Sequence, residues 1–346
     1  MKIGWASMGD LLEDPITGQL MSQADRHRML VEGAVTAEEA GFWSASLGEH
    51  HFCDYVVSAP PVVLAAIAER TTKIRLGTAV ALGANNDPIR LAEDYATLDV
   101  LSGGRVELVV GRGNLYEHTY DAFGQDPGLS RPMYEERVGL LVDALRNEQL
   151  DWSGEFRSPF HNYTTQPRPL QDPLPIWVGG GSSIESAEYA AKMALPLMLP
   201  GVFGPPKIFL PLVERYREAW EEHGHPSHDC LVGTIAHTFM AASSQEAFRV
   251  SGPRFKVYME WVRDLLRLST PALGDLIRET DLKQMTERGP TVCGSREEVL
   301  DKMSMYRETL GLDVYLLMCD LGGMPASELT ETLFAFGSEI LPEFAQ

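Results

Sequence analysis

The segment Gly48-Glu49-His50-His51-Phe52 contains the residues best suited to do chemistry in this chain. Two adjacent histidines behind a glutamate bring groups that titrate near neutral pH into one small space. The apolar run Phe42 to Leu47 precedes them and predicts a strand, so both histidines follow its carboxyl end. In parallel α/β proteins this end of the sheet carries the catalytic residues. The alternative, for these five residues alone, is a pair of loop histidines without a role.

Three further segments of unusual composition follow other predicted strands. The small residues of Gly77-Thr78-Ala79-Val80 let a planar ligand approach the backbone, although small residues are also ordinary barrel packing. In Gly111-Arg112-Gly113 an arginine between two glycines is sterically free to meet an anion, and its rigid fork suits phosphate. The segment Gly179 to Ser183 leads into a helix whose free N–H groups and hydroxyls suit phosphate. Each segment alone also fits a turn or a surface charge, but together they predict a bound phosphorylated cofactor.

Eight predicted strands alternate with helices and must position these residues. The strands are Lys2–Ser7, Trp43–Gly48, Ile74–Val80, Val106–Gly111, Pro175–Gly180, Pro196–Pro200, Leu231–Ala241 and Val314–Cys319. The helices are Asp25–Ala40, Ser58–Arg70, Pro88–Leu101, Pro132–Asn147, Ser183–Met193, Pro206–His223, Arg296–Leu310 and Ala326–Leu341. Capping boxes at Ser295 to Glu298 and at Ser182 to Glu185 mark two helix starts. The alternation predicts an α/β fold, a (β/α)8 TIM barrel that spans residues 1–346 as a single domain.

Two segments break the alternation. Asp151–Gln171 is rich in aromatic residues and prolines and predicts a small hairpin before the fifth strand. Ser243–Pro290 is an insertion before the last strand, longer than one crossover helix needs. Its amphipathic stretch Phe255–Leu268 precedes the polar stretch Ser269–Gly289. Long insertions at the catalytic face serve as lids or substrate walls, so a lid over residues 243–290 is expected. A surface helix pair with no catalytic part is the alternative.

Composition excludes several classes of partner. With 29 basic and 49 acidic residues the net charge is −20, which argues against nucleic acid and against anionic membranes. No apolar run approaches the roughly 18 residues that span a bilayer. The start of the chain, Met1 to Trp5, reads as a strand and has no signal-peptide layout, so a cytoplasmic location is expected.

The cysteines and the histidine-rich loop predict no metal site. Cys53, Cys230, Cys293 and Cys319 are scattered and form no metal-type or redox pair. His223, His225 and His228 lie near Cys230 between a helix and a strand, but they contain no tight two-ligand helical pair. A solvated loop is therefore expected there.

The motifs, taken in order along nearly the whole chain, resemble the bacterial luciferase-like flavin-dependent monooxygenase family. Any one piece is unspecific, whereas the combination in this order is highly specific. The pieces are Glu49-His50-His51-Phe52, Lys73 to Ala79, Asp99 to Arg105, Gly111-Arg112-Gly113, Pro175 to Gly180 and Val292 to Val299.

The resemblance implies a (β/α)8 barrel that binds FMN or reduced FMN, usually as a homodimer. The residues implied to bind the flavin phosphate are Arg112, Arg131, Ser182, Ser183 and Ser186. Ala79 and Val80 would lie against the isoalloxazine ring, where the luciferases have a non-proline cis peptide. His50 matches the family's essential histidine, and His51 is its neighbour.

The resemblance also implies a reaction. Reduced FMN, supplied by a separate flavin reductase, would react with O2 to a C4a-hydroperoxyflavin that oxidises a small organic substrate. Water destroys that intermediate, so a lid is needed. His50 would act as general base or hydrogen-bond donor. Glu49 would orient it or, equally, form a surface salt bridge. Four aromatic residues would line the pocket or, at least as readily, belong to the core: Tyr116, Trp177, Tyr163 and Phe52.

Three positions depart from the family. Gly111 replaces a reactive cysteine beside the flavin, Ser182 replaces an acidic residue at the phosphate site, and Gly201 replaces an aromatic residue. These changes count against light emission and a long-chain aldehyde substrate, and they leave flavin binding intact. Two other functions stay open, a deazaflavin-dependent oxidoreductase of the same fold and a non-catalytic flavin-binding protein. The doubled histidine favours the monooxygenase.

Overall fold

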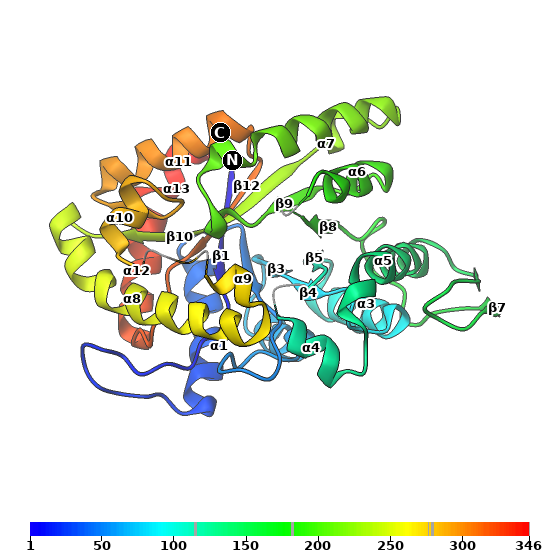
Figure 1. The fold of residues 1–346 in the computed structure, drawn as a ribbon, viewed down its shortest axis with the longest axis horizontal. Helices are drawn as coiled ribbons and strands as arrows, with labels where there is room; N and C mark the ends of the chain where they lie inside the picture. Colours follow the sequence, from blue (N-terminus) through cyan, green and yellow to red (C-terminus); the bar gives the residue numbers. More distant parts are fainter. Residues whose placement is uncertain (114–115, 181–182, 276, 278–279, 346) are drawn as a thin grey trace.

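Eight parallel strands of the described chain close into a barrel (Figure 1). The structure is a computed structural model that describes residues 1–113, 116–180, 183–275, 277 and 280–345. The closure comes from β10, which pairs with β9 on one side and with β12 on the other, while β12 pairs with β1. The barrel strands are β1 (Lys2–Ser7), β2 (Ser44–Leu47), β3 (Arg75–Thr78), β5 (Val106–Gly111), β8 (Ile176–Gly179), β9 (Leu197–Leu199), β10 (Val232–Met240) and β12 (Val314–Met318). All eight predicted strands are present, and the predicted (β/α)8 barrel is confirmed.

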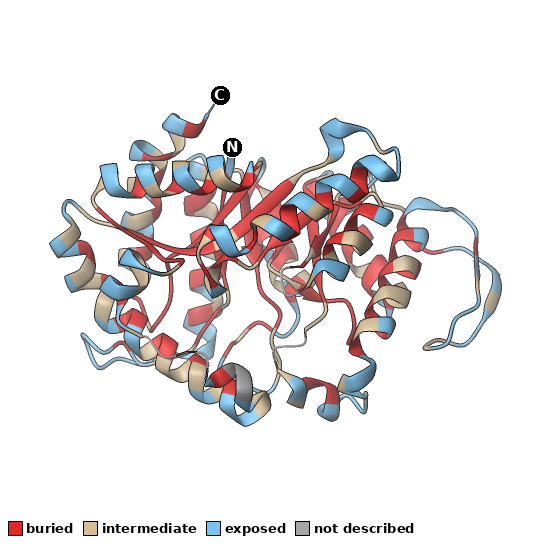
Figure 2. Cartoon of the chain, turned by 45° about the horizontal axis from the view of Figure 1, so that its top comes forward, coloured by how far each residue is buried: buried red, intermediate tan, exposed pale blue. Residues whose placement is uncertain are grey.

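Apolar side chains fill both sides of these strands. The barrel interior is packed by Ala6, Val109, Trp177, Met198, Val314, Leu316 and Met318. The outer faces of the strands pack against the helices, so the strands are buried and the helices expose only their outer sides (Figure 2). Near-continuous apolar runs are typical of parallel strands covered on both faces.

The surrounding helices begin close to the predicted signals. They are α1 (Gln23–Glu39), α2 (Pro60–Ala68), α3 (Pro88–Ser102), α5 (Ser130–Arg146), α6 (Ile184–Lys192), α7 (Leu210–Glu222), α11 (Arg296–Leu310) and α12 (Ala326–Glu339). The capping box between Ser295 and Glu298 forms as predicted. The second predicted box begins at Ser182, which lies outside the described residues. The N-cap of α6 is Ser183, whose side chain makes no capping hydrogen bond.

The two irregular segments have different structures. β6 (Leu150–Trp152) and β7 (Phe160–Tyr163) form the predicted antiparallel hairpin. The segment 243–290 contains α8 (Ser244–Ser269), α9 (Pro271–Gly274) and α10 (Leu282–Glu287). It leads into β11 (Val292–Gly294), a short strand that was not predicted and that pairs with the end of β10. Further short elements include β4 (Ala81–Leu82), α4 (Glu117–Ala122) and α13 (Leu341–Phe344).

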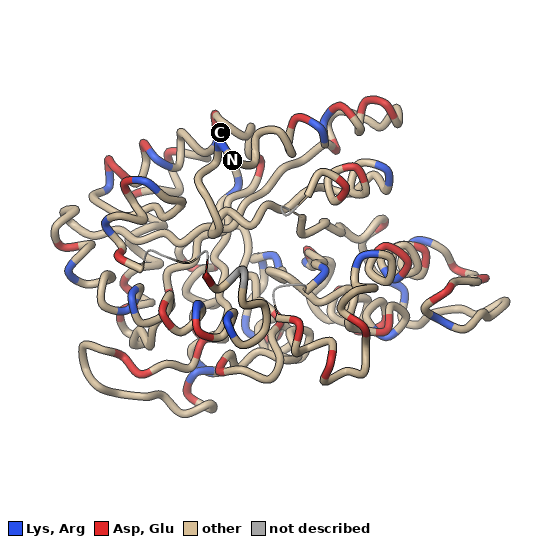
Figure 3. Tube along the Cα trace, viewed as in Figure 1, with Lys and Arg blue, Asp and Glu red and all other residues tan. Residues whose placement is uncertain are grey.

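Acidic and basic residues are distributed over the outer helices (Figure 3). Across the described residues, the helices lack the combination of length and apolar character that crossing a bilayer requires.

Candidate active site

The candidate residues gather at the carboxyl ends of the barrel strands. His50 and His51 follow β2, Ala79 and Val80 follow β3, and Arg112 follows β5. Ser183 and Ser186 lie at the start of α6, after β8, and Arg131 lies in the first turn of α5. Ser182 is outside the described residues. The structure divides these residues between two places. One is an arginine pocket around Arg112 and Arg131, and the other is a histidine cluster formed by His50 and His51.

The arginine pocket is an open hollow of about 350 Å³, a volume that includes the solvent at its mouth. Its lining residues are Arg112, Arg131, Tyr134, Glu135, Val178, Gly179, Ser186 and Tyr189. The guanidinium of Arg131 donates to Ser183 Oγ (2.8 Å), and this hydroxyl lies 3.2 Å from Ser186 Oγ. The pocket therefore combines two cationic forks with two hydroxyls, which are groups that bind phosphate oxygens well.

The charge of this pocket is incompletely balanced. Within the described part of the chain, no carboxylate lies within 4.0 Å of Arg112, and Arg131 approaches Glu135 and Glu185 only at 3.9 and 3.8 Å. Burial, and then the positive charge of Arg131, lower the pKa of Arg112. Two neighbouring cations without a close counter-charge suit a dianion. The residues present thus fit the phosphate of FMN.

Ala79 and Val80 lie between the arginine pocket and the histidine cluster, and the peptide bond that joins them is cis. The Val80 carbonyl accepts a hydrogen bond from the backbone N–H of Glu49 (3.0 Å). The two methyl groups of Val80 pack against two glycines. A Cβ built on Gly111 would lie 2.4 Å from one methyl group, and a Cβ built on Gly179 would lie 2.8 Å from the other.

Close packing gives two of the three departures from the family a steric reason. A cysteine at position 111 would require Val80 to move. A Cβ on Gly201 would lie 2.4 Å from Thr234 Oγ1 and 2.8 Å from the Ile235 carbonyl oxygen, so an aromatic side chain does not fit on this backbone.

The imidazole of His50 is held by rings. It stacks on Tyr55 with centroids 4.0 Å apart, and Tyr116 meets it edge-on at 5.5 Å. Its Nδ1 is buried and has no hydrogen-bond partner among the described residues. Burial, and then the neighbouring His51, lower the pKa of His50 to about 3. The expectation that this imidazole titrates near neutral pH is therefore not met, and burial favours the neutral ring, whose low pKa makes it a weak base.

Glu49 is buried and contacts the other histidine. Its Oε1 lies 2.9 Å from His51 Nε2, and its carboxylate also accepts from the Leu82 N–H (2.8 Å) and from Asn86 Nδ2 (3.0 Å). Only 5% of the residue is exposed, so it forms no surface salt bridge. The carboxylate orients His51, and the expectation that it orients His50 is wrong.

Of four aromatic residues expected to line the pocket, two lie beside the histidines. Tyr116 packs on His50, and Phe52 packs near His51 with 61% of its surface exposed. Trp177 lies inside the barrel and donates to Glu107 (2.9 Å), and Tyr163 lies on the exposed β6–β7 hairpin. These last two residues are remote from the histidine cluster because one belongs to the core and the other to a surface excursion.

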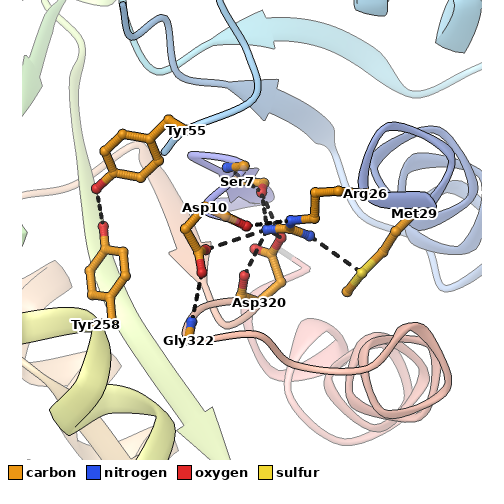
Figure 4. A network of polar contacts seen from close by, with 9 residues as sticks. Ser7, Asp10, Arg26, Met29, Tyr55, Tyr258, Asp320 and Gly322 are labelled. Carbon is orange, nitrogen blue, oxygen red and sulfur yellow. Dashed lines mark hydrogen bonds and ion pairs between the residues drawn. The ribbon is translucent and has the colours of Figure 1, made fainter. Parts of the chain in front are cut away.

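Asp10, Arg26 and Asp320 form a buried charged cluster that was not predicted from the sequence (Figure 4). Arg26 on α1 contacts Asp10 (3.4 Å) and Asp320 (3.0 Å), and all three residues are at most 4% exposed. Burial raises the pKa of Asp10 to about 6, an effect that Arg26 partly offsets. Asp10 follows β1 and Asp320 follows β12, so the search of strand ends that identified His50 would also have found both carboxylates. Arg26 gave no such signal, because it lies within a helix.

Comparison with known proteins agrees with this geometry. The family model described as luciferase-like monooxygenase matches residues 1–313. A flavin-dependent trigonelline monooxygenase, oxygenase component, from Acinetobacter baylyi is 24% identical over 341 residues, which cover 94% of this chain and 92% of that protein. The alkanal monooxygenase alpha chain of Photorhabdus laumondii is 30% identical over 233 residues, 66% of this chain and 64% of that one.

A solved structure extends the similarity to the whole fold. The crystal structure of monooxygenase RslO1 from Streptomyces bottropensis superimposes with a TM-score of 0.85 at 26% identity and covers 100% of both chains. Since the family model spans most of the sequence and the barrel has the same architecture, the chain belongs to the luciferase-like monooxygenase family.

Proposed function

We propose that this chain is the oxygenase component of a flavin-dependent monooxygenase. It binds reduced FMN supplied by a separate flavin reductase and transfers one oxygen atom of O2 to a small organic substrate. The observation that carries the proposal is the arrangement of an arginine pocket, a strip formed by Ala79 and Val80, and the neutral His50 along one face of the barrel. The name of the Acinetobacter relative, an oxygenase component, supports a separate reductase.

Each part of this face has its own task. Arg112, Arg131 and the hydroxyls of Ser183 and Ser186 hold the phosphate. Ala79 and Val80 support the flavin ring and direct it toward the histidine cluster. When bound, reduced FMN supplies the electrons that activate O2.

His50 acts on the reacting substrate. It serves as general base or as hydrogen-bond donor through its imidazole, whose Nδ1 is not engaged by another described residue. His51, held by Glu49, lines the same side of the site.

The function itself is tested with purified protein, a flavin reductase, NADH and a panel of organic substrates under 18O2. One labelled oxygen atom in a product, formed with reduced FMN and absent with reduced deazaflavin, supports the proposal. Turnover with deazaflavin and no oxygen would point instead to the deazaflavin-dependent oxidoreductase. Flavin binding without turnover of any substrate, and with no oxygen consumption beyond that of free reduced flavin, would point to a non-catalytic flavin-binding protein.

The phosphate pocket sets the affinity for FMN. Arg112→Ala is expected to weaken FMN binding by about tenfold or more, since one charge-assisted hydrogen bond contributes about 1.5–3 kcal/mol. Binding of riboflavin, which lacks the phosphate, should hardly change. Fluorescence titration with both ligands measures the difference.

Arg146→Ala, at the exposed far end of α5, is the matched control and should bind both ligands like the native protein. Equal weakening of FMN and riboflavin by Arg112→Ala would mean that Arg112 supports packing and does not bind the phosphate.

We also propose that residues 270–290 act as a lid. The preceding helix α8 is fixed, because Arg254 pairs with the buried carboxylate of Asp14 (2.9 Å). Its last residue, Ser269, accepts a hydrogen bond from the His118 N–H (3.3 Å), and His118 Nε2 lies 3.4 Å from the His51 carbonyl oxygen. The start of the segment therefore lies near the histidine cluster. The stretch from Asp275 to Arg288 contains seven charged residues, and of its apolar side chains Leu282 is buried in the core.

Limited proteolysis is expected to cut first between Thr270 and Gly289, and FMN with substrate should slow the cutting. Deletion of this stretch should leave the barrel folded and should raise the oxygen consumed per product, because water then reaches the flavin. First cuts elsewhere, with this stretch resistant in the cofactor-free protein, would show a packed structural element.

The chain is further proposed to work as one domain and as a homodimer. Sedimentation velocity measures the oligomeric state.

A further inference from the structure

Within the described part of the chain, ring packing orients the imidazole of His50. Among the described residues its Nδ1 has no partner, whereas the neighbouring His51 is held by the carboxylate of Glu49. A catalytic base is usually fixed by a hydrogen-bonding third group. Here the closest ring is Tyr55, which stacks on His50 at 4.0 Å with an angle of 29° between the planes. The orientation of His50 therefore depends on what holds Tyr55.

Tyr55 is held at its hydroxyl by α8. The hydroxyls of Tyr55 and Tyr258 lie 2.8 Å apart, and both residues are buried (Figure 4). Trp261, one turn further along α8, meets the Tyr55 ring edge-on at 4.6 Å. This hydrogen bond joins two residues 203 positions apart, one beside the candidate base and the other on the helix that leads into residues 270–290.

Tyr55 is also held through its backbone. The Leu11 N–H donates to the Asp54 carbonyl (2.8 Å), and the Val56 N–H donates to the Gly9 carbonyl (2.8 Å). Asp10, between them, forms a β-bridge with Tyr55 and accepts from the Gly322 N–H (2.8 Å). The backbone of Tyr55 is thus attached to the loop after β1, and the hydroxyl end of its side chain is attached to α8.

We propose that Tyr55 and Tyr258 are positioning residues that fix the His50 ring and connect it to α8. The inference rests on the proposed role of His50, and it adds that α8 and the segment after it are linked mechanically to the base. The fixed helix α8 thereby holds the Tyr55 ring and, through the stack, the imidazole in place. Ordinary packing of a buried tyrosine would not link these two segments. Tyr216, for comparison, donates to a backbone carbonyl, that of Leu195 (3.2 Å).

The first test needs neither cofactor nor substrate. The variants are Tyr258→Phe, Tyr55→Phe and the double variant, with Tyr216→Phe as a control that also loses one buried hydroxyl. Modification of His50 by diethyl pyrocarbonate, followed by mass spectrometry, should be faster by about two- to tenfold in both single variants, the factor that corresponds to one net hydrogen bond. The double variant should be no faster than the singles, because all three lack the same bond. Tyr216→Phe should leave the rate unchanged.

The second test uses turnover. Tyr258→Phe is expected to lower kcat for substrate oxidation by about tenfold, the scale of a slightly misplaced catalytic group, with the KM for reduced FMN unchanged. In a His50→Gln background the same substitution should have no further effect, since residues that act through one another are not additive.

The outcomes separate the two proposals. Unchanged His50 modification in both tyrosine variants, or equal acceleration by Tyr216→Phe, would overturn the positioning role. An additive loss of kcat in the His50→Gln background would overturn it as well. Faster His50 modification in a protein that oxidises no substrate would leave the positioning role standing and would refute the proposed function.

Discussion

Replacing His50 with alanine is expected to cut product formation by about 100-fold or more, the usual contribution of a general acid or base. The affinity for reduced FMN should stay nearly unchanged, because His50 is not among the residues that line the arginine pocket. Oxygen uptake should continue as release of H2O2. Product yield by mass spectrometry, a peroxide assay and anaerobic flavin titration measure the three quantities, and together they assign the loss to chemistry and not to binding.

Two further histidines serve as comparisons. His161→Ala, on the exposed β6–β7 hairpin, should behave like the native protein. His51→Ala tests the neighbour that Glu49 holds. A His50→Ala protein with normal product yield would refute the assignment, and a large loss in His51→Ala would then move the role of base to His51.

The barrel was predictable because its strands are short apolar runs separated by helices. β1 and β5 have the predicted bounds, and the other barrel strands are shorter than predicted by one or two residues at their ends. β11 was missed because a three-residue strand gives no periodic signal and exists only by pairing with the end of β10. Helix α5 begins at Ser130, two residues earlier than the proline that marked its predicted start.

The site was predictable only in part. The motif resemblance named residues that the structure gathers around one pocket, including Arg112, which follows a strand end, and Arg131, which lies in the first turn of α5. The direction of Glu49 toward His51 depends on backbone geometry that the sequence does not express. The link between Tyr55 and Tyr258 joins segments far apart in the chain, and no local pattern announces it.

The buried cluster around Arg26 leads to the second large effect. Arg26→Met is expected to lower the free energy of unfolding by about 3–5 kcal/mol at pH 7, the scale for removing one partner of a buried ion pair. The substitution leaves Asp10 and Asp320 buried without the guanidinium that contacts both. Urea denaturation of the native and variant proteins measures the difference. Arg28→Met, on the same helix, is the matched control and should change little, because the Arg28–Asp25 pair is exposed.

The loss of stability in Arg26→Met should depend on pH, and the direction of this dependence follows from the pKa of Asp10. The pKa of this carboxyl is about 6 in the folded protein against an ordinary value of 3.8 in an unfolded chain, so its protonation contributes stability below pH 3.8 that is lost as pH rises through about 6. Without Arg26, which lowers the pKa of both carboxyls, these pKa values rise further and the window moves upward. The deficit of Arg26→Met should therefore shrink between pH 7 and pH 5. Burial lowers the pKa of His50 and of His237, which destabilises both proteins equally as pH falls and cancels in the difference. A deficit that stays constant with pH, or one no larger than that of Arg28→Met, would show that the cluster does not hold its carboxylates through Arg26.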